Sequence, residues 1–200
     1  AEIAAEFVEK VRINPGNYID KRKPTEAAKI SNAEYNAELS RMHERLLPLI
    51  SICKKNGMAI RIGSNYGSLS QRIISRYGNT PEGMVEAAME FYHIFRKEDF
   101  TQLVLSMKAS HPRIMAQACR LLNSRMIQEG MVFPQHLGVT EAGEGAEGRL
   151  RSALGLGAVL SDGIGDTLRV SLTEEPEKEI PVAKQIIRIL DKKPGAGVQN

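Results

Sequence analysis

The sequence has few of the residues that mark a specialised protein class. It contains two cysteines, Cys53 and Cys119, and no tryptophan in 200 residues. Two cysteines exclude a disulfide scaffold and a zinc site built from paired Cys-x-x-Cys ligands. Both lie in helical patterns, so we expect them to be buried free thiols. No His, Cys, Asp and Glu spacing typical of a metal site is present, and we predict none.

Long apolar runs and a large net charge are also missing. No stretch approaches the roughly 20 apolar residues of a transmembrane helix, and the first residues lack the charged start and apolar middle of a signal peptide. Lys and Arg total 27 against 24 Asp and Glu, a net charge of +3. This excess is too small to indicate nucleic acid or a membrane surface as a partner. We expect a soluble protein of a reducing compartment, in which cations matter by position.

Five short segments have the composition and alternation of β-strands. They are residues 11–14, 59–63, 103–108, 136–140 and 168–172. Helical apolar stripes cover residues 33–55, 82–97, 112–129, 147–161 and 180–191. Thr80 and Ser110 are expected N-caps, and Gly57 is an expected helix stop. Alternating strands and helices predict parallel strands joined by crossovers, in a TIM barrel or an open doubly wound sheet.

Each predicted strand has one apolar and one polar face. Successive side chains of a strand point to opposite sides, so Val11 and Ile13 lie opposite Arg12 and Asn14. An open doubly wound sheet buries both faces under helices, and its strands are continuously apolar. In a barrel the second face is the interior, and the carboxyl ends of the strands form the active site. The pattern favours an α/β fold that is part of a TIM (β/α)8 barrel, with about five βα units.

Four of the five polar faces carry a cation. These cations are Arg12, Arg61, Lys108 and Arg169. A single one could form a salt bridge inside the barrel, but four that converge favour an anionic ligand such as phosphate or diphosphate. Neutral hydrogen-bonding groups on the same faces or just beyond them are Asn14, Asn65, Ser106, Ser171 and His136.

Loops after the strands agree with an anion site. Asn14–Asn17 and Gly63–Ser70 follow strands, where backbone N–H groups can cradle phosphate. Glu141 comes just after a strand and is either a helix-start carboxylate or a proton donor or acceptor near the anion. His43 and His93 lie within predicted helices, and we expect structural roles for them.

Five segments of the chain are familiar as an ordered set. They are Val11–Asn17, Arg61–Ser70, Ser106–Ser110, His136–Gly143 and Gly163–Leu172. Together they resemble the 4-hydroxy-3-methylbut-2-enyl diphosphate synthase family, iron–sulfur enzymes of the non-mevalonate isoprenoid pathway. Each motif is modest alone, but five in order from about residue 11 to 191 are specific. The loop that starts at Glu141 is similar to the long, three-domain form of plants and some bacteria.

The resemblance implies an oxidoreductase that reductively opens 2-C-methyl-D-erythritol 2,4-cyclodiphosphate, with two electrons, a 4Fe-4S cluster and loss of water. It implies ferredoxin or flavodoxin as electron donor, and the bacterial cytoplasm or plastid stroma as location. By resemblance, the diphosphate would be bound by Arg12, Arg61, Asn65, Lys108, Arg169 and Ser171, with Asn14 and His136 in support. Glu141 would be the candidate catalytic proton source.

The resemblance also implies a partial domain. The family holds its cluster with three cysteines and a glutamate in a C-terminal domain, whereas Cys53 and Cys119 lie in helical stretches. We expect residues 1–200 to be a partial TIM-barrel substrate-binding domain, without the barrel's N-terminal strands and the C-terminal 4Fe-4S domain. This chain alone would then bind no cluster and be inactive. Its open strand edges favour a homo-oligomer or partial disorder.

Two other classes of function remain open. One is a different phosphosugar-type TIM-barrel lyase or isomerase without a cluster, for which Lys108 is the candidate Schiff-base lysine. The other is a non-catalytic phosphate-binding or assembly module.

Overall fold

The computed structural model describes residues 1–18 and 30–191. Its strands form one five-stranded sheet in the order β1-β2-β3-β4-β5, and every neighbouring pair is parallel. The strands are β1 (Lys10–Ile13), β2 (Ala59–Asn65), β3 (Leu103–Ala109), β4 (His136–Val139) and β5 (Thr167–Arg169). Strands that follow one another in sequence are neighbours in the sheet. A doubly wound sheet reverses its strand order at a switch point, so the predicted barrel order is confirmed.

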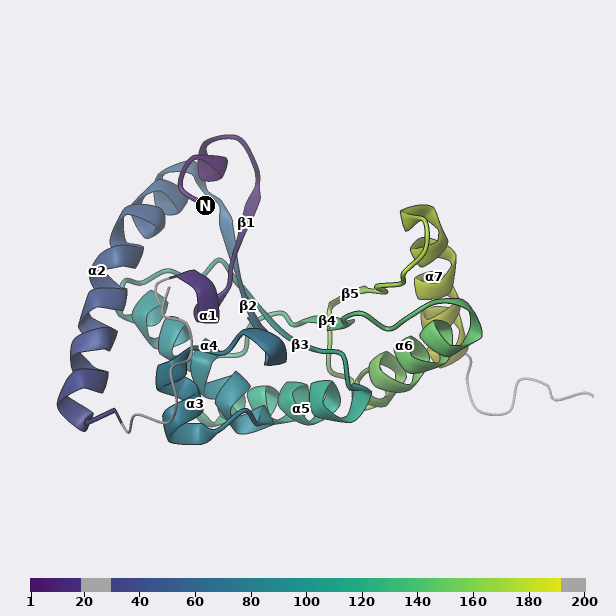
Figure 1. Cartoon of the computed structure of the whole chain (residues 1–200). Helices are drawn as coiled ribbons and strands as arrows, with labels where there is room; N and C mark the ends of the chain where they lie inside the picture. Colours follow the sequence, from purple (N-terminus) through teal and green to yellow (C-terminus); the bar gives the residue numbers. More distant parts are fainter. Residues whose placement is uncertain (19–29, 192–200) are drawn as a thin grey trace, which may run out of the picture.

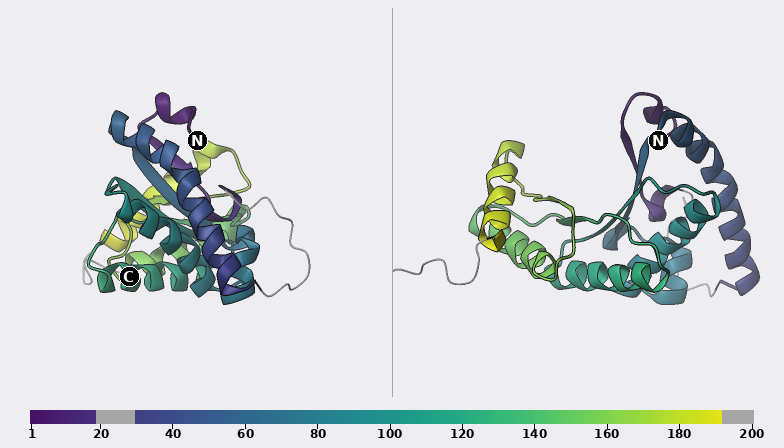
Figure 2. Two further views of the ribbon diagram at one scale, coloured as in Figure 1. Left: turned by 90° about the vertical axis from the view of Figure 1, so that its left-hand side faces the viewer. Right: turned by 180° about the vertical axis from the view of Figure 1, so that it is seen from behind.

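The main helices lie on one side of this sheet. They are α2 (Asn32–Asn56), α4 (Pro81–Lys97), α5 (Pro112–Gln128), α6 (Gly145–Leu160) and α7 (Glu179–Asp191). Figure 1 shows them as an outer arc with the strands inside it, and Figure 2 shows the same arc from the side and from behind. Short elements fill the connections: η1 (Ala4–Glu6), α1 (Pro15–Tyr18), η2 (Tyr66–Ser68), α3 (Gln71–Tyr77) and η3 (Pro176–Lys178).

The apolar strand faces form the core beneath the helices. Burial alternates along β1, where Val11 and Ile13 are buried and Arg12 is exposed. The core also contains, fully or nearly fully buried, Ile60, Ile62, Leu105, Met107, Leu137, Val139, Phe91, Tyr92 and Phe95. Burying these side chains stabilises the fold by about 1.5–3 kcal/mol for each large aliphatic or aromatic one. Because the apolar side chains of the strands face the helices, the polar side chains at the alternating positions lie on the inner face of the sheet.

A buried polar cluster ties three of the helices together. The carboxylate of Glu90 on α4 pairs with Arg72 on α3, and the hydroxyl of Tyr35 on α2 donates to the same carboxylate. Arg72 and Glu90 are both almost fully buried. Removing one partner of a buried ion pair of this kind is strongly destabilising.

Two helix boundaries follow from the sequence. The hydroxyl of Thr80 accepts the N–H of Gly83 at 3.0 Å, as an N-cap should. Gly57 ends α2 in the left-handed region, with φ 65°, where glycine is favoured. Both predictions are confirmed.

Other boundaries differ from the prediction, and two of the differences have a clear local cause. The N-cap of α5 is His111, not Ser110: its Nδ1 accepts the N–H of Arg113 at 3.3 Å. Pro112 requires an extended residue immediately before it, which makes that residue the cap. The last strand is Thr167–Arg169, not 168–172. Beyond Arg169 the backbone finds other partners, such as Glu179, whose Oε1 accepts the N–H of Leu172 at 3.1 Å.

Both cysteines lie in the core of the described structure. Cys53 and Cys119 are free thiols with no exposed surface, as predicted. Within residues 1–18 and 30–191, no helix is long and apolar enough to cross a membrane.

Candidate anion-binding site

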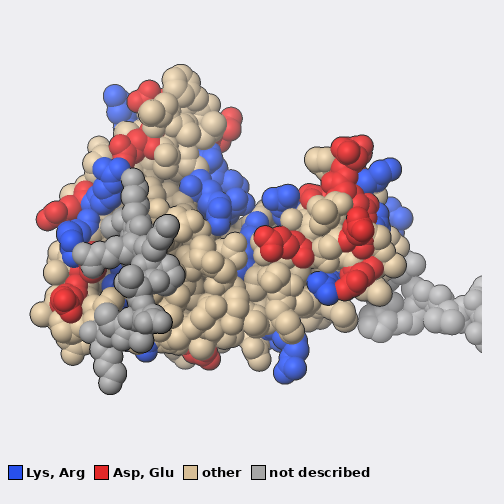
Figure 3. All heavy atoms as spheres, in the orientation of Figure 1, with Lys and Arg blue, Asp and Glu red and all other residues tan. Residues whose placement is uncertain are grey.

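Four cations come together on the inner face of the sheet. We call Arg12, Arg61, Lys108 and Arg169 the cation face. Arg12 of β1 is the register partner of Arg61 of β2, and Gly138 of β4 is the partner of both Lys108 and Arg169. Register partners in a sheet project to the same side. Figure 3 shows Lys and Arg atoms gathered in the hollow between the two ends of the curved sheet.

Mutual repulsion is visible in the pKa values of these groups. Burial lowers the pKa of Lys108 from 10.5 to about 8, with further lowering by Arg61, Arg12 and Arg169. Burial also lowers the pKa of Arg61, assisted by Arg12 and Arg169. Cations that lower one another's pKa from four different strands share one electrostatic environment. An anion placed among them would relieve this repulsion.

Most of this charge has no carboxylate partner. In the described part of the chain, Arg12, Arg61 and Lys108 form no ion pair, and Nε of Arg61 is buried without a hydrogen-bond partner. Arg169 differs, because its Nε lies 3.4 Å from Oε2 of Glu179 at the start of α7. The salt-bridge alternative therefore describes Arg169 and not the other three cations.

The side-chain amides of Asn14 and Asn65, both predicted site residues, form hydrogen bonds within the loops that follow β1 and β2. The side-chain Nδ2 of Asn14 donates to Oγ of Ser68 at 2.9 Å, and its Oδ1 accepts the N–H of Gly16 at 3.1 Å. Oδ1 of Asn65 accepts the N–H of Gly67 at 3.4 Å and caps η2. These bonds fix the two loops at the carboxyl edge of the sheet, beside the cation face.

His136 is kept neutral at this site. Burial lowers its pKa from 6.5 to about 4, with further lowering by Lys108, Arg61, Lys10 and Arg169. Its Nδ1 lies 2.9 Å from Oγ of Thr167 on β5, a partner that the sequence did not indicate. A neutral imidazole fixed by this contact can orient a polar group without adding charge.

Glu141 and Ser171 lie in neighbouring segments at the same edge. The N–H of Ala142 donates to the carbonyl of Ser171 at 3.1 Å. Glu141 is exposed in the loop after β4 and adopts φ 52°, a conformation that costs a non-glycine residue about 1 kcal/mol or more. It is not the cap of α6, which begins after Glu144. The helix-start interpretation of Glu141 is therefore wrong.

Two glycines on the inner face were not predicted as site residues. A Cβ on Gly63 would lie 2.4 Å from Nε of Arg12. A Cβ on Gly138 would lie 3.2 Å from Cε of Lys108. The available sequence signal was a glycine inside a strand pattern, which marks a close approach.

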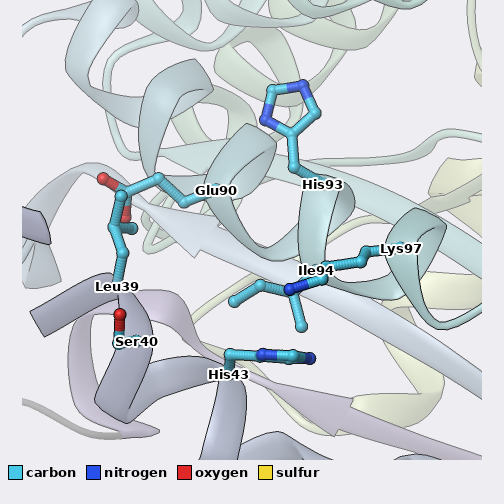
Figure 4. A pocket seen from close by; sticks show the side chains of 7 residues that line it. All are labelled: Leu39, Ser40, His43, Glu90, His93, Ile94 and Lys97. Atoms are coloured by element: carbon cyan, nitrogen blue, oxygen red, sulfur yellow. The ribbon is translucent and has the colours of Figure 1, made fainter. Parts of the chain in front are cut away.

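Three cavities of the described residues lie away from the cation face. One of about 300 Å³ between α2 and α4 is lined by Leu39, Ser40, His43, Glu90, His93, Ile94 and Lys97 (Figure 4). Its histidines have carboxylate partners: Nε2 of His43 lies 2.6 Å from Glu98, and Nε2 of His93 lies 2.9 Å from Glu129. Each pair joins a helix to the residue that ends a later helix, Glu98 after α4 and Glu129 after α5. The other two cavities lie beside Arg76 on α3 and between α5 and α6.

The described residues do not suit an iron–sulfur cluster. No group of three or more His, Cys, Asp or Glu side chains in residues 1–18 and 30–191 is placed to hold a metal ion. Cys53 on α2 and Cys119 on α5 are buried in the core. Burial raises the pKa of the Cys119 thiol to about 12, which opposes the thiolate that iron needs.

A parallel sheet in barrel order, with helices outside and a cation-rich inner face, defines part of a TIM-barrel domain. The model of the GcpE TIM-barrel domain family matches residues 1–184, and the chain belongs to this family. The resemblance seen in the five motifs is thereby confirmed.

Curated relatives carry one shared name, 4-hydroxy-3-methylbut-2-en-1-yl diphosphate synthase (flavodoxin). The Bacteroides fragilis protein is 57% identical over 187 residues, which are 94% of this chain and 30% of that protein. The Akkermansia muciniphila protein is 56% identical over 185 residues, or 92% and 32%. The Leptospira interrogans protein is 52% identical over 190 residues, or 95% and 28%. The chain thus spans about a third or less of the length of these relatives.

Proposed function

We propose that this chain is the substrate-binding barrel portion of a 4-hydroxy-3-methylbut-2-en-1-yl diphosphate synthase. The main support is the cation face, where Arg12, Arg61 and Lys108 converge from three strands without a carboxylate partner among the described residues. Guanidinium and ammonium groups with free donors suit the oxygens of a diphosphate. The name shared by the relatives gives a substrate class that fits.

The proposed roles follow the placement of the residues. Arg12, Arg61, Lys108 and Arg169 bind the diphosphate through charge, and Asn65 and Ser171 add hydrogen bonds at the carboxyl edge. Asn14 and His136 support the site, through Ser68 and Thr167 respectively. A bound diphosphate offsets the repulsion that lowers the pKa of Lys108, so binding is expected to raise that pKa.

The proposed reaction assigns this chain binding and proton transfer. The ring of 2-C-methyl-D-erythritol 2,4-cyclodiphosphate opens as two electrons and two protons enter and one water leaves. Glu141 is the proposed proton donor, because its loop adjoins Ser171 at the carboxyl edge. Flavodoxin, the word printed in the name of the relatives, or ferredoxin would supply the electrons.

The remaining chemistry is assigned to parts of the protein outside this segment. A 4Fe-4S cluster would deliver the electrons, and Cys53 and Cys119 do not provide its ligands. In the proposed domain plan, residues 1–200 form part of the TIM barrel. Further N-terminal strands close the barrel, and a C-terminal domain holds the cluster. Residues 1–200 alone are then expected to be inactive, and the bacterial relatives favour a cytoplasmic location.

Pyrophosphate binding tests the anion site directly. Titration calorimetry is expected to show that Arg61→Met weakens pyrophosphate affinity by about 10- to 100-fold, the loss typical of one charge-assisted hydrogen bond. The matched control is Arg113→Met, which removes the same charge from an exposed residue of α5 and should change affinity less than about twofold. Equal losses in both variants, or no binding by the protein, would refute the proposal.

The low pKa of Lys108 favours one alternative function. A half-buried lysine with a pKa of about 8 is a suitable Schiff-base nucleophile for a carbonyl substrate. Borohydride reduction in the presence of phosphorylated aldehydes and ketones, followed by peptide mass spectrometry, distinguishes the two functions. Turnover of such a substrate with a trapped adduct on Lys108 would establish an aldolase-type enzyme instead.

A further inference from the structure

We propose that Gly63 and Gly138 are positioning residues of the anion site. Because each glycine has no side chain, a cationic side chain from the preceding strand can lie over the strand that contains the glycine. Arg12 of β1 crosses β2 at Gly63, and Lys108 of β3 crosses β4 at Gly138. This inference rests on the proposed function and adds to it a steric requirement on β2 and β4.

The contact at Gly63 is the tighter one. Arg12 is the register partner of Arg61, so the next inner position of β2 toward the carboxyl edge is Gly63. Nη2 of Arg12 donates to the carbonyl of Gly63 at 3.0 Å. A Cβ on Gly63 would lie 2.4 Å from Nε and 3.2 Å from Cζ of Arg12. Any side chain at position 63 must therefore displace the guanidinium, although the backbone around it can stay in place.

The contact at Gly138 repeats the arrangement two strands further on. Gly138 stands in register between Lys108 and Arg169. A Cβ there would lie 3.2 Å from Cε and 3.6 Å from Cδ of Lys108, and at an ordinary contact distance of 3.4 Å from the carbonyl oxygen of Arg169. The aliphatic part of Lys108 thus passes over β4 toward Arg169. These distances are longer than those at Gly63, so a methyl group should shift Lys108 by only a few tenths of an ångström.

Backbone conformation does not explain either glycine. The described glycines with positive φ include Gly57, Gly78 and Gly165, but neither Gly63 nor Gly138. Alanine can therefore adopt the backbone at both positions. Glycine inside a strand weakens the strand unless something lies close to it. In both cases the nearest group is a cationic side chain of the preceding strand.

A double-mutant cycle between Gly63→Ala and Arg12→Ala tests the inference. With Arg12 present, Gly63→Ala is expected to weaken pyrophosphate affinity at least about fivefold and to lower the urea midpoint of unfolding. With Arg12→Ala as background, the same change should alter affinity less than about twofold and should leave the midpoint equal or higher. A merely structural glycine would give the same loss in both backgrounds.

A second cycle and a control keep the test decisive. Gly138→Ala should weaken affinity by a smaller factor of about two to three, and this loss should disappear in a Lys108→Ala background, which removes the aliphatic chain that contacts position 138. Gly157→Ala is the control, because a Cβ at this position of α6 meets nothing within 4 Å. It should leave affinity unchanged.

The outcomes separate this inference from the proposed function. If the protein binds no pyrophosphate, the proposed function fails, and the unfolding midpoints alone decide the positioning role. Midpoints and affinities that show no coupling between position 63 and Arg12 would overturn the inference even where pyrophosphate binds. If Gly63→Ala does not fold, the cycle between Gly138 and Lys108 decides it.

Discussion

Replacing Lys108 with methionine is expected to stabilise the fold while it weakens anion binding. The ammonium group lies half-buried near Arg61, Arg12 and Arg169. Burial and repulsion therefore destabilise its charged form in the folded protein as long as no anion is bound. Methionine keeps an unbranched apolar chain that can still pass over Gly138. The substitution thus removes the charge and keeps most of the packing.

The magnitude follows from the pKa of Lys108. Its fall from 10.5 to about 8, at 1.36 kcal/mol per pKa unit, corresponds to about 3 kcal/mol against the charged folded state. The amine is only partly buried, and solvent screening reduces this figure to about 1–2 kcal/mol. Lys108→Met should increase the free energy of unfolding at pH 7 by that amount.

The effect has a defined pH window. The folded pKa is lower than the unfolded pKa, so between about pH 8 and 10.5 the unfolded chain binds more protons than the folded one. The stability of the protein with Lys108 therefore rises as pH rises through this window. Below pH 8 the penalty is complete, and the advantage of the methionine variant should shrink steadily above it.

Urea unfolding at pH 7 and at about pH 9.5 measures both the size and the sign of this effect. Lys97→Met on α4 is the control, since Lys97 is exposed and distant from the cation face. Saturating pyrophosphate should reverse the order and make the lysine protein the more stable one. A Lys108→Met protein that is less stable at pH 7, or whose advantage does not shrink at high pH, would refute the reasoning.

Three further predictions concern other residues. His136 has its pKa lowered from 6.5 to about 4, so stability should fall as pH falls from about 6.5 to 4; urea unfolding of His136→Asn should show a weaker fall. Glu141→Gly removes the strain of φ 52° and should raise the free energy of unfolding by about 0.5–1 kcal/mol in thermal denaturation, whereas Glu141→Gln should not. Glu90→Leu breaks the buried ion pair with Arg72 and should cost about 3 kcal/mol in urea unfolding. Glu147→Leu, in an exposed pair with Arg151, should cost less than about 0.5 kcal/mol.

Periodicity was sufficient to predict the sheet and its main helices. Alternation of period two placed Val11 and Ile13 in the core and Arg12 on the inner face, and these placements are observed. They depend only on residues that are near in sequence. The roles of the site residues in binding and proton transfer remain predictions, because burial and register do not report a ligand.

Features that depend on contacts between distant segments were not predictable. The pairing of Arg169 with Glu179 requires α7 to fold back against β5. The steric role of Gly63 depends on which residue of β1 lies beside it in register. Beyond the end of β5, the N–H of Leu172 donates to the side chain of Glu179 on α7 and not to a neighbouring strand. Single-sequence patterns do not carry this information, since each case joins two separate elements.

The cation face draws on the first and the last strand of the described sheet as well as on the strands between them. Arg12 lies on β1 and Arg169 on β5, the two edge strands of the described sheet (Figure 1), and both lower the pKa of Arg61 and of Lys108. A diphosphate that touched both would act as a removable cross-link across the arc. At 100 times its dissociation constant, a ligand adds about 2.7 kcal/mol to stability. A bound diphosphate would then stabilise the curvature of the sheet in addition to filling the space between its edge strands.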